Sequence, residues 1–490
     1  MKKMLQKNNN RNSDVIMYFI GKLAPAILGF LNIYLIAKKL SPEEYGEYAL
    51  IILVLLFFQF FGSWVNQAIF YYLPKSGHEK KGMAIWFGQM TFYIAIIGSV
   101  VVVSGFVIDG VKYDIAIAAG LVFLFQIYWN YLSTYYQSCE QSKIQLIATL
   151  WQVSIQITFI SLLYFFNRIS VFGAVVSILI GFFTGNFWYV KHKDFNQNII
   201  SISGVSWINF CRYTKLAINY SGPLCMWFLF CQIYTFSDRF LLKWAGLSAE
   251  LGRYSATRDL LLGVVSIFSM PLLMVAHPMI MRIWSERKAV SEIQLIIQRN
   301  LTIIFIVGAF FIMMLSGYGN IIFSTFFSSK YKLQNVEYVL MVGAILFSVA
   351  SMYAHKSLEV TGATLKVAFL GGGVALFSVL ANFILIKRFG LLGVEIVGLL
   401  SQLIYFFVAS YLSRKYWNVV IPVRRISLIL LVVISVFLLS KLVDMWYPLP
   451  VANRFPVPWG LIVAIVFSIF SILRFHEISD LFGKYGFAKK

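Results

Sequence analysis

The sequence predicts an all-α membrane protein that crosses the bilayer about fourteen times, and three observations support this fold class. Of the 490 residues, 60% are hydrophobic and only 12% are charged, whereas an ordinary soluble domain is roughly 45–50% apolar and about 25% charged. The mean hydropathy is +0.78. Apolar blocks long enough to cross a bilayer as helices recur along the whole chain. This composition excludes disordered, collagen-like and disulfide-stapled classes.

The net charge of +21 would suggest a nucleic-acid partner in a soluble protein. Here the charges stand between apolar blocks, so we interpret the excess as the cytoplasmic bias of short membrane loops and expect no nucleic acid to bind. The four cysteines form no C-x-x-C pair and the five histidines are scattered. We therefore expect no metal site and no catalytic centre.

The first apolar block, residues 15–37, follows a short basic segment. It is too long for the apolar part of a signal peptide, and a second block begins soon after it, so we expect it to be retained as a helix. A window of about 19 residues places the full set of spans near 15–37, 48–73, 83–107, 115–137, 144–166, 171–190, 216–243, 252–277, 300–322, 336–356, 367–388, 392–413, 426–447 and 457–474.

An even number of spans puts both termini on one side of the membrane. Most of the Lys and Arg residues fall in segments on that same side, which the positive-inside rule assigns to the cytoplasm. We therefore expect both termini to be cytoplasmic and the turn at 41–47 to lie outside.

A short motif recurs in the two halves of the chain. Leu-Ser, a glutamate and then Gly-x-Tyr occur at 40–48 and again at 247–254, and a second echo links 167–174 with 387–394. Six spans separate the copies, so both copies enter the membrane in the same sense. This predicts a parallel repeat about an axis along the membrane normal.

The repeat predicts four parts. Residues 1–190 form an N-terminal lobe of six helices, 191–215 a cytoplasmic linker, 216–413 a C-terminal lobe of six helices, and 414–490 two further helices with a cytoplasmic tail. Within the linker, apolar residues at mixed spacing indicate either an interfacial helix or a simple connection.

The motifs also resemble those of a known family. The run Leu-Ser-Pro-Glu-Glu-Tyr-Gly-Glu-Tyr-Ala at 40–49 resembles the first outside turn of the bacterial polysaccharide flippases, which translocate oligosaccharide-lipids for O-antigen, capsule and exopolysaccharide assembly. Ser-Asp-Arg-Phe-Leu-Leu at 237–242 and Gly-Arg-Tyr-Ser-Ala at 252–256 are similar to the family's seventh helix and the start of its eighth. Val-Thr-Gly at 360–362 and Phe-Gly-x-x-Gly at 389–393 resemble its later helices.

The resemblance implies the fold of the multidrug/oligosaccharidyl-lipid/polysaccharide exporter superfamily, with two six-helix lobes around a central cavity. It implies alternating-access transport of an undecaprenyl-pyrophosphate-linked oligosaccharide from the inner to the outer leaflet of the bacterial cytoplasmic (inner) membrane. The implied partners are this cargo and the lipid bilayer, with a polysaccharide polymerase and chain-length proteins as further candidates. The implied energy source is an H⁺ or Na⁺ gradient or the membrane potential, without a bound cofactor.

A pyrophosphate cargo needs cations inside the membrane, where a charge normally faces a cavity or a partner. Lys22 lies roughly 12 Å along the first helix and either attracts phosphate or snorkels to the interface or to an acid. Arg239 and Arg258 are the other predicted cavity cations. Asp238 and Asp259 either organise these arginines for cargo or neutralise them in structural pairs.

Uncharged polar side chains inside the spans either contact sugar or form hydrogen bonds between helices. They are Asn66, Gln67, Gln126, Asn130, Gln152, Gln156 and Asn382. Glu395 is an acid well inside a predicted span and either binds a coupling proton or pairs with a lysine. Aromatic residues at 128–136 either stack on sugar or lie at a membrane interface.

Other functions fit less well. An enzyme would gather catalytic groups near a surface, a multidrug exporter would have a more apolar cavity with an acidic site, and a scaffold would not need ionisable residues in its spans. A flippase for the lipid-linked precursor of the cell wall shares the same fold and remains the main alternative, together with the multidrug exporter.

Overall fold

The computed structural model describes residues 29–73, 80–139, 141–191, 206–286, 289–326 and 329–419. The first predicted span is seen only from residue 29, as a helix that continues to residue 39. Lys22 and the predicted spans 426–447 and 457–474 lie outside the described residues.

The described chain is helical throughout, apart from short connections. Its elements are α2 (Pro42–Phe58), α3 (Phe60–Tyr72), α4 (Lys80–Ile108), α5 (Tyr113–Ser138), α6 (Ser142–Phe165), α7 (Val171–Val190), α9 (Trp207–Trp244), α10 (Ser248–Glu286), α11 (Val290–Phe326), the 3₁₀ turn η3 (Ser329–Tyr331), α12 (Asn335–Ala354), α13 (Lys356–Val360) and α14 (Thr364–Ser413).

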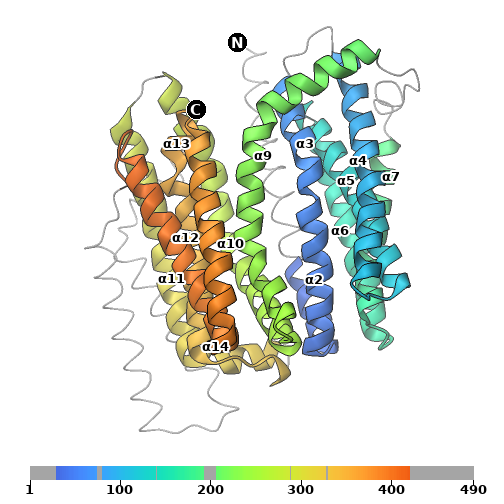
Figure 1. Ribbon diagram of the computed structural model, residues 1–490, viewed down its shortest axis with the longest axis vertical. Coiled ribbons are helices and arrows are strands. Elements are labelled where there is room, and N and C mark those ends of the chain that lie inside the picture. The colour runs from blue at the N-terminus through green and yellow to red at the C-terminus, as the bar shows by residue number, and fades with distance from the viewer. Residues whose placement is uncertain are drawn as a thin grey trace, which may run out of the picture.

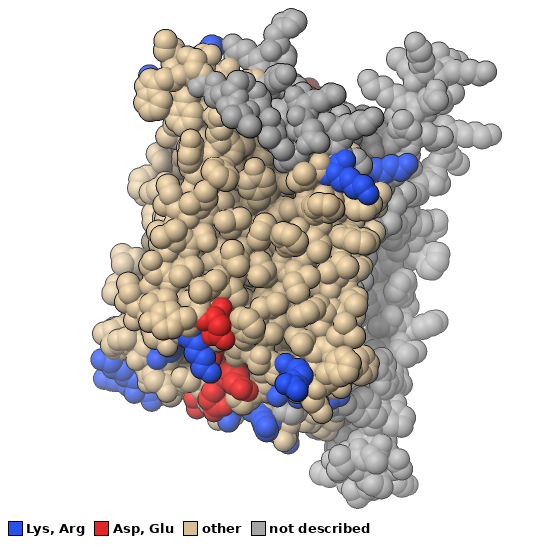
Figure 2. Space-filling view, turned by 90° about the vertical axis from the view of Figure 1, so that its right-hand side faces the viewer, with Lys and Arg blue, Asp and Glu red and all other residues tan. Residues whose placement is uncertain are grey.

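These helices make the chain a multi-pass membrane protein. Within the described residues, seven helical segments are long and apolar enough to cross a bilayer, and two bent pairs raise the number to nine. Figure 2 shows an uncharged band over one face, with charged side chains gathered toward the ends of the helices. This pattern is typical of a protein in a bilayer, because the hydrocarbon layer excludes charged groups while the two membrane surfaces accept them.

The predicted spans at 367–388 and 392–413 both lie in α14. This helix is broken at Gly390. That residue has φ 56° and ψ −130°, a backbone conformation that favours glycine. A Cβ on Gly393 would lie 2.7 Å from the backbone oxygen of Leu385. The two arms of α14 therefore meet at a sharp, closely packed break. They correspond to the two predicted spans, although the seven segments counted above include α14 as one.

Helix α9 starts inside the segment 191–215 that we expected to be a linker. It begins at Trp207 and runs to Trp244 without a connection at 215. Tyr213 is buried and its ring contacts that of Trp86 of α4. Residues 207–215 are therefore helical rather than a simple connection, and Tyr213 packs this stretch on the N-terminal helices. The division into two lobes and a linker stays a prediction.

Two of the long helices are bent. The angle between α2 and α3 is 45°, and α9 bends by 49° between its parts Trp207–Gly222 and Cys225–Tyr234. The first part of α9 packs on α3, where the Tyr72 hydroxyl donates to the Leu216 carbonyl at 3.2 Å. The later part packs on α14. In Figure 1, α9 accordingly stands between α2–α7 on one side and α10–α14 on the other.

The two copies of the Leu-Ser…Gly motif meet each other directly. A Cβ on Gly252 would overlap the Pro42 carbonyl oxygen, and a Cβ on Gly46 would lie 3.0 Å from the Ser248 oxygen. Gly46 and Gly252 are equivalent positions of the motif, and each contacting oxygen belongs to the residue four positions before the glycine of its own copy. Such a reciprocal contact is what two copies related by a two-fold axis make. The N-terminal ends of α2 and α10 are thus joined by backbone contact that only glycine permits.

This contact predicts the effect of two matched substitutions on α10. Gly252→Ala forces the ends of α2 and α10 apart, and overpacking of this kind destabilises by about 1–3 kcal/mol. Gly263→Ala is the control, since a Cβ there meets nothing within 4 Å. We expect thermal unfolding of the detergent-purified protein to shift down for Gly252→Ala and not for Gly263→Ala. Equal melting curves for the two variants would contradict the close approach.

Candidate functional site

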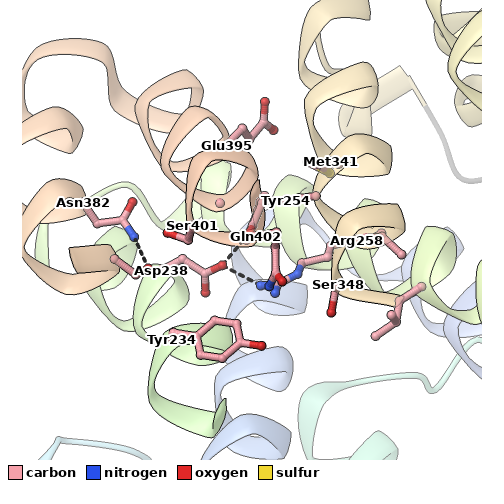
Figure 3. A pocket seen from close by; sticks show the side chains of 15 residues that line it. Tyr234, Asp238, Tyr254, Arg258, Met341, Ser348, Asn382, Glu395, Ser401 and Gln402 are labelled. Atoms are coloured by element: carbon pink, nitrogen blue, oxygen red, sulfur yellow. Dashed lines mark hydrogen bonds and ion pairs between the residues drawn. The ribbon is translucent and has the colours of Figure 1, made fainter. Parts of the chain in front are cut away.

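A polar cavity lies among the helices of the C-terminal half. It is open to solvent on one side, and α9, α10, α12 and both arms of α14 supply its walls. Figure 3 shows its polar side chains converging from these helices. The polar residues of the lining are Tyr234, Asp238, Tyr254, Arg258, Ser348, Ser378, Asn382, Glu395, Ser401 and Gln402.

Asp238 is the most fully bonded group of the cavity. Its Oδ2 accepts hydrogen bonds from the Tyr254 hydroxyl and from Arg258 Nη1, each at 2.5 Å. Its Oδ1 accepts the backbone N–H of Arg239 at 2.7 Å. The carboxylate is 5% exposed, and an ionised acid is stable at such a depth only when it is paired and hydrogen-bonded. Asp238 therefore holds Arg258 in place.

A second ion pair crosses between the same two helices. Arg239 bonds both carboxylate oxygens of Asp259, with Nη1 3.4 Å from Oδ2. The two pairs connect adjacent residues of α9, Asp238 and Arg239, with adjacent residues of α10, Arg258 and Asp259. The four charges sum to zero, so the cluster is electrically neutral as a unit.

The two predicted arginines differ in their access to the cavity. Arg258 lines it, whereas Arg239 is 6% exposed and is not part of the lining. The ion pair with Asp238 uses Nη1 of Arg258. The guanidinium of Arg258 also lies 5.5 Å from the centre of the Tyr254 ring. A guanidinium has five N–H donors. Arg258 therefore retains donors for a ligand while its position is fixed by Asp238 and Tyr254.

The α14 side of the cavity carries buried polar atoms that are not satisfied by protein. Asn382 Nδ2 lies 3.4 Å from Ser378 Oγ. Asn382 Oδ1, Ser401 Oγ, Gln402 Oε1 and both carboxylate oxygens of Glu395 have no hydrogen-bond partner among the described residues. Buried polar groups are normally paired. This wall is therefore suited to bind a polar ligand rather than an apolar one.

The predicted polar residues of the N-terminal half lie away from this cavity. Asn66 and Gln67 are on α3, and Asn130 of α5 donates to Gln59 Oε1 at 3.5 Å. Gln152 and Gln156 of α6 bond to each other at 3.0 Å. Gln126 is half-buried on α5.

The contacts of Asn130, Gln152 and Gln156 fit the alternative of hydrogen bonding within the helix bundle. Gly181 and Gly185 of α7 pack closely against Gln152, which accounts for the burial of that side chain. The aromatic residues at 128–136 are mostly buried in the same half, where Tyr131 and Tyr136 are fully covered. They belong to a helix-packing core.

A second charged cluster lies where α10, α13 and α14 approach each other. Lys356 Nζ donates to Glu359 Oε2 at 2.5 Å and lies 3.3 Å from His277 Nδ1. His355 Nδ1 lies 3.3 Å from the Tyr405 hydroxyl. Lys356 is only 5% exposed, although it stands at the very end of the predicted span 336–356. Two histidines that are far apart in the sequence, His277 and His355, are therefore brought to the same cluster by the fold.

Sequence reasoning missed several residues of the cavity, and helical spacing would have indicated most of them. Tyr254 precedes Arg258 by four residues and so shares its face of α10, and Tyr234 precedes Asp238 by four residues on α9 in the same way. Gln402 follows Glu395 by seven residues, which also places both on one face of α14. Ser348 carries no such signal, because single Ser residues are common in apolar helices.

Comparison with known proteins identifies the class. A family model described as "Polysaccharide biosynthesis protein" matches residues 12–284, which is more than half of the chain. No curated protein sequence matches significantly.

Among solved structures, the lipid II flippase MurJ in an inward closed conformation aligns with TM-score 0.72 and 16% identity over 94% of this chain and 99% of that one. An inward-facing MATE multidrug resistance transporter of the MOP superfamily aligns with TM-score 0.65 and 12% identity over 82% of this chain and 98% of that one. An outward-facing MATE transporter gives TM-score 0.55 and 12% identity over 82% and 93%.

The fold is thus that of MOP-superfamily transporters, a class of multi-pass membrane proteins. The chain belongs to the polysaccharide biosynthesis protein family. The resemblance drawn from the motifs is confirmed at the level of the family and of the fold.

The buried ion pair predicts a double-mutant signature. Arg258→Gln leaves the Asp238 charge without its cation, and breaking a buried pair costs about 3–5 kcal/mol. Asp238→Asn combined with Arg258→Gln removes both charges, so the double variant should recover most of the melting temperature of the detergent-purified protein.

The exposed pair Lys243–Asp109 supplies the control, since Lys243→Gln should change stability by about 0–1 kcal/mol. A double variant that is as unstable as the sum of its single substitutions would show that the pair is not coupled.

Proposed function

We propose that the protein translocates a polyprenyl-pyrophosphate-linked oligosaccharide from the inner to the outer leaflet of the bacterial cytoplasmic membrane. The observation that carries this proposal is a polar cavity with a positioned arginine, found in a member of the polysaccharide biosynthesis protein family. The products served would be surface polysaccharides such as O-antigen or exopolysaccharide, with a polymerase and chain-length proteins as further partners.

The chemistry of such a cargo explains the composition of the cavity. Moving a pyrophosphate and a glycan through hydrocarbon without a path forfeits their hydration, at a cost of many kcal/mol. Arg258 offers a planar fork that can donate two hydrogen bonds to one phosphate. Asn382, Ser401 and Gln402 offer amide and hydroxyl groups of the kind that bond to sugar hydroxyls. Lys22 and Arg239 remain proposed as supporting cations.

Two relatives of the same fold define the alternatives. A cell-wall precursor flippase would also need a phosphate-binding cation, so the fold and Arg258 alone do not separate it from an oligosaccharide flippase. A multidrug exporter would favour a cavity with an ionised surplus acid. Here Asp238 and Asp259 are each matched by an arginine, and Glu395 is the acid of the lining that has no matching arginine. Mass spectrometry of the lipid-linked intermediate that accumulates in a deletion strain separates these functions directly.

We further propose alternating access between two six-helix lobes, 1–190 and 216–413, followed by two C-terminal helices. The reciprocal contact of Gly46 and Gly252 supports this arrangement, because it joins equivalent ends of the two halves. With the turn at 41–47 outside, that contact closes the outer end. The higher similarity to an inward-facing than to an outward-facing MATE transporter supports the same state.

The cargo proposal predicts a specific loss on Arg258→Lys. The lysine keeps the charge opposite Asp238 but loses the bidentate fork, so glycan export should fall while stability stays near normal. Lys22→Gln and Arg239→Gln should each reduce export without a loss of membrane insertion. Export is measured as surface glycan per unit of membrane-inserted protein. Unchanged export in all three variants, at matched protein level, would remove these residues from the mechanism.

The proposed topology predicts opposite labelling of two sites. Cys211 is an exposed native cysteine near the start of α9, which we place on the cytoplasmic side, whereas Ser41 lies at the outer turn. In a background without the other cysteines, an impermeant thiol reagent should label Ser41→Cys in intact cells and Cys211 only in inverted vesicles. Labelling of Cys211 in intact cells would reverse the topology.

A further inference from the structure

Glu395 is an acid that the ion pairs of the cavity do not use. It lies on the second arm of α14, five residues after the break at Gly390 and therefore roughly 7 Å along the helix. It lines the cavity and is 2% exposed. Neither of its carboxylate oxygens has a hydrogen-bond partner among the described residues. In Figure 3 its carboxyl group points away from the Asp238–Arg258 pair.

Among the described residues, the groups around Glu395 provide no opposite charge for it. Arg258, the cation in the described lining of the cavity, is held by Asp238 on α9 and lies over Tyr254 on α10. The first arm of α14 contributes the neutral Asn382, and the second arm contributes Ser401 and Gln402. From α12, Tyr338 and Glu337 face it within electrostatic range.

Glu337 is a like charge, and it is the better stabilised of the two acids. It lies in the first turn of α12, where its Oε2 accepts the backbone N–H of Gln334 at 2.6 Å. Arg253 of α10 also attracts it. Two nearby carboxyl groups cannot both hold a negative charge cheaply, so the charge settles on the one with donors. That residue is Glu337.

An ionised Glu395 at this position would be an unpaired charge in a membrane interior. The desolvation of such a group is not offset by any contact on this wall, and the usual result is that the group takes up a proton. We propose that Glu395 is a proton-binding site of the cavity, and that its carboxyl group must be protonated for an anionic lipid-linked headgroup to bind beside Arg258.

The requirement that Glu395 be protonated for cargo binding rests on the proposed function, and it follows from the charges of the cavity. The cluster of Asp238, Arg239, Arg258 and Asp259 is neutral, so an ionised Glu395 would give the described part of the cavity a net negative charge beside Arg258 and repel pyrophosphate. A protonated Glu395 leaves the cavity neutral with donors available on Arg258. By linkage, anion binding then strengthens proton binding at Glu395 by the same factor.

The proton site is tested without any cargo, by infrared difference spectroscopy of the full chain in lipid during a pH titration. A protonated carboxylic acid has a carbonyl stretch that a carboxylate lacks. We expect this band in the wild type at neutral pH, and its loss in Glu395→Gln. Glu47→Gln, on an exposed position of α2, is the control and should leave the band in place.

A second variant tests the role of the like charge and protects against a folding artefact. Glu337→Gln removes the negative neighbour, so Glu395 should release its proton at lower pH than in the wild type, with the band still present in acid. Identical spectra of the wild type and Glu395→Gln at neutral pH would overturn the proton site. Loss of the band on adding Na⁺ at constant pH would also overturn it, in favour of a sodium ligand.

The link to cargo is tested by binding of undecaprenyl pyrophosphate to the protein in nanodiscs. We expect wild-type affinity to fall by up to about tenfold per pH unit once Glu395 ionises, as one linked proton allows. Glu395→Gln should bind tightly at every pH tested, with this dependence removed. A pH dependence that survives in Glu395→Gln would refute the link.

The two proposals fail in different ways. If undecaprenyl pyrophosphate binds at no pH while the Glu395 band is present, the cargo proposal and the link fail and the proton site stands. If the lipid binds but the band is absent, the proton site and the link fail while the proposed cargo is supported.

Discussion

The structure depends on one constraint, which is that a charge inside the bilayer must be matched by another charge or neutralised. Asp238 and Asp259 on adjacent helices each meet an arginine, so that α9 and α10 are joined in a fixed register. Lys356 of α13 pairs with Glu359 in the same way. Each of these ion pairs also fixes the position of the side chains that form it. The electrostatic need for pairing thus supplies the preorganisation that a binding site requires.

A second constraint acts through volume rather than charge. Gly46 and Gly252 allow backbone to touch backbone where α2 and α10 begin, and the Tyr331 hydroxyl adds hydrogen bonds to the Leu40 and Ser41 carbonyls at the same place, at 3.0 and 3.2 Å. In lipid, close approach of this kind replaces the hydrophobic effect as the force between helices.

The membrane class, most span positions and the family were predictable, because composition, the length of the apolar blocks and short motifs indicate them directly. The cavity was only partly predictable. Helical spacing shows that Asp238 and Arg239 are near Arg258 once two helices are paired, but it does not show which arginine faces the cavity. The burial of Lys356 was not predictable, since its neighbours in space, His277 among them, come from distant parts of the chain. Residue spacing along one helix shows which side chains share a face. Only the packing of several helices shows which residues that face contacts.

The continuity of α9 has a consequence for how the protein is assembled. Its first part stacks Tyr220 on Tyr71 of α3 with ring centres 4.0 Å apart, while its later part packs on α14, more than a hundred residues further along the chain. During synthesis the N-terminal helices are present before α14 emerges from the ribosome. The start of α9 can therefore dock on a finished surface and hold its later part in position. The first half of the chain thereby acts as an internal template for the insertion of the second.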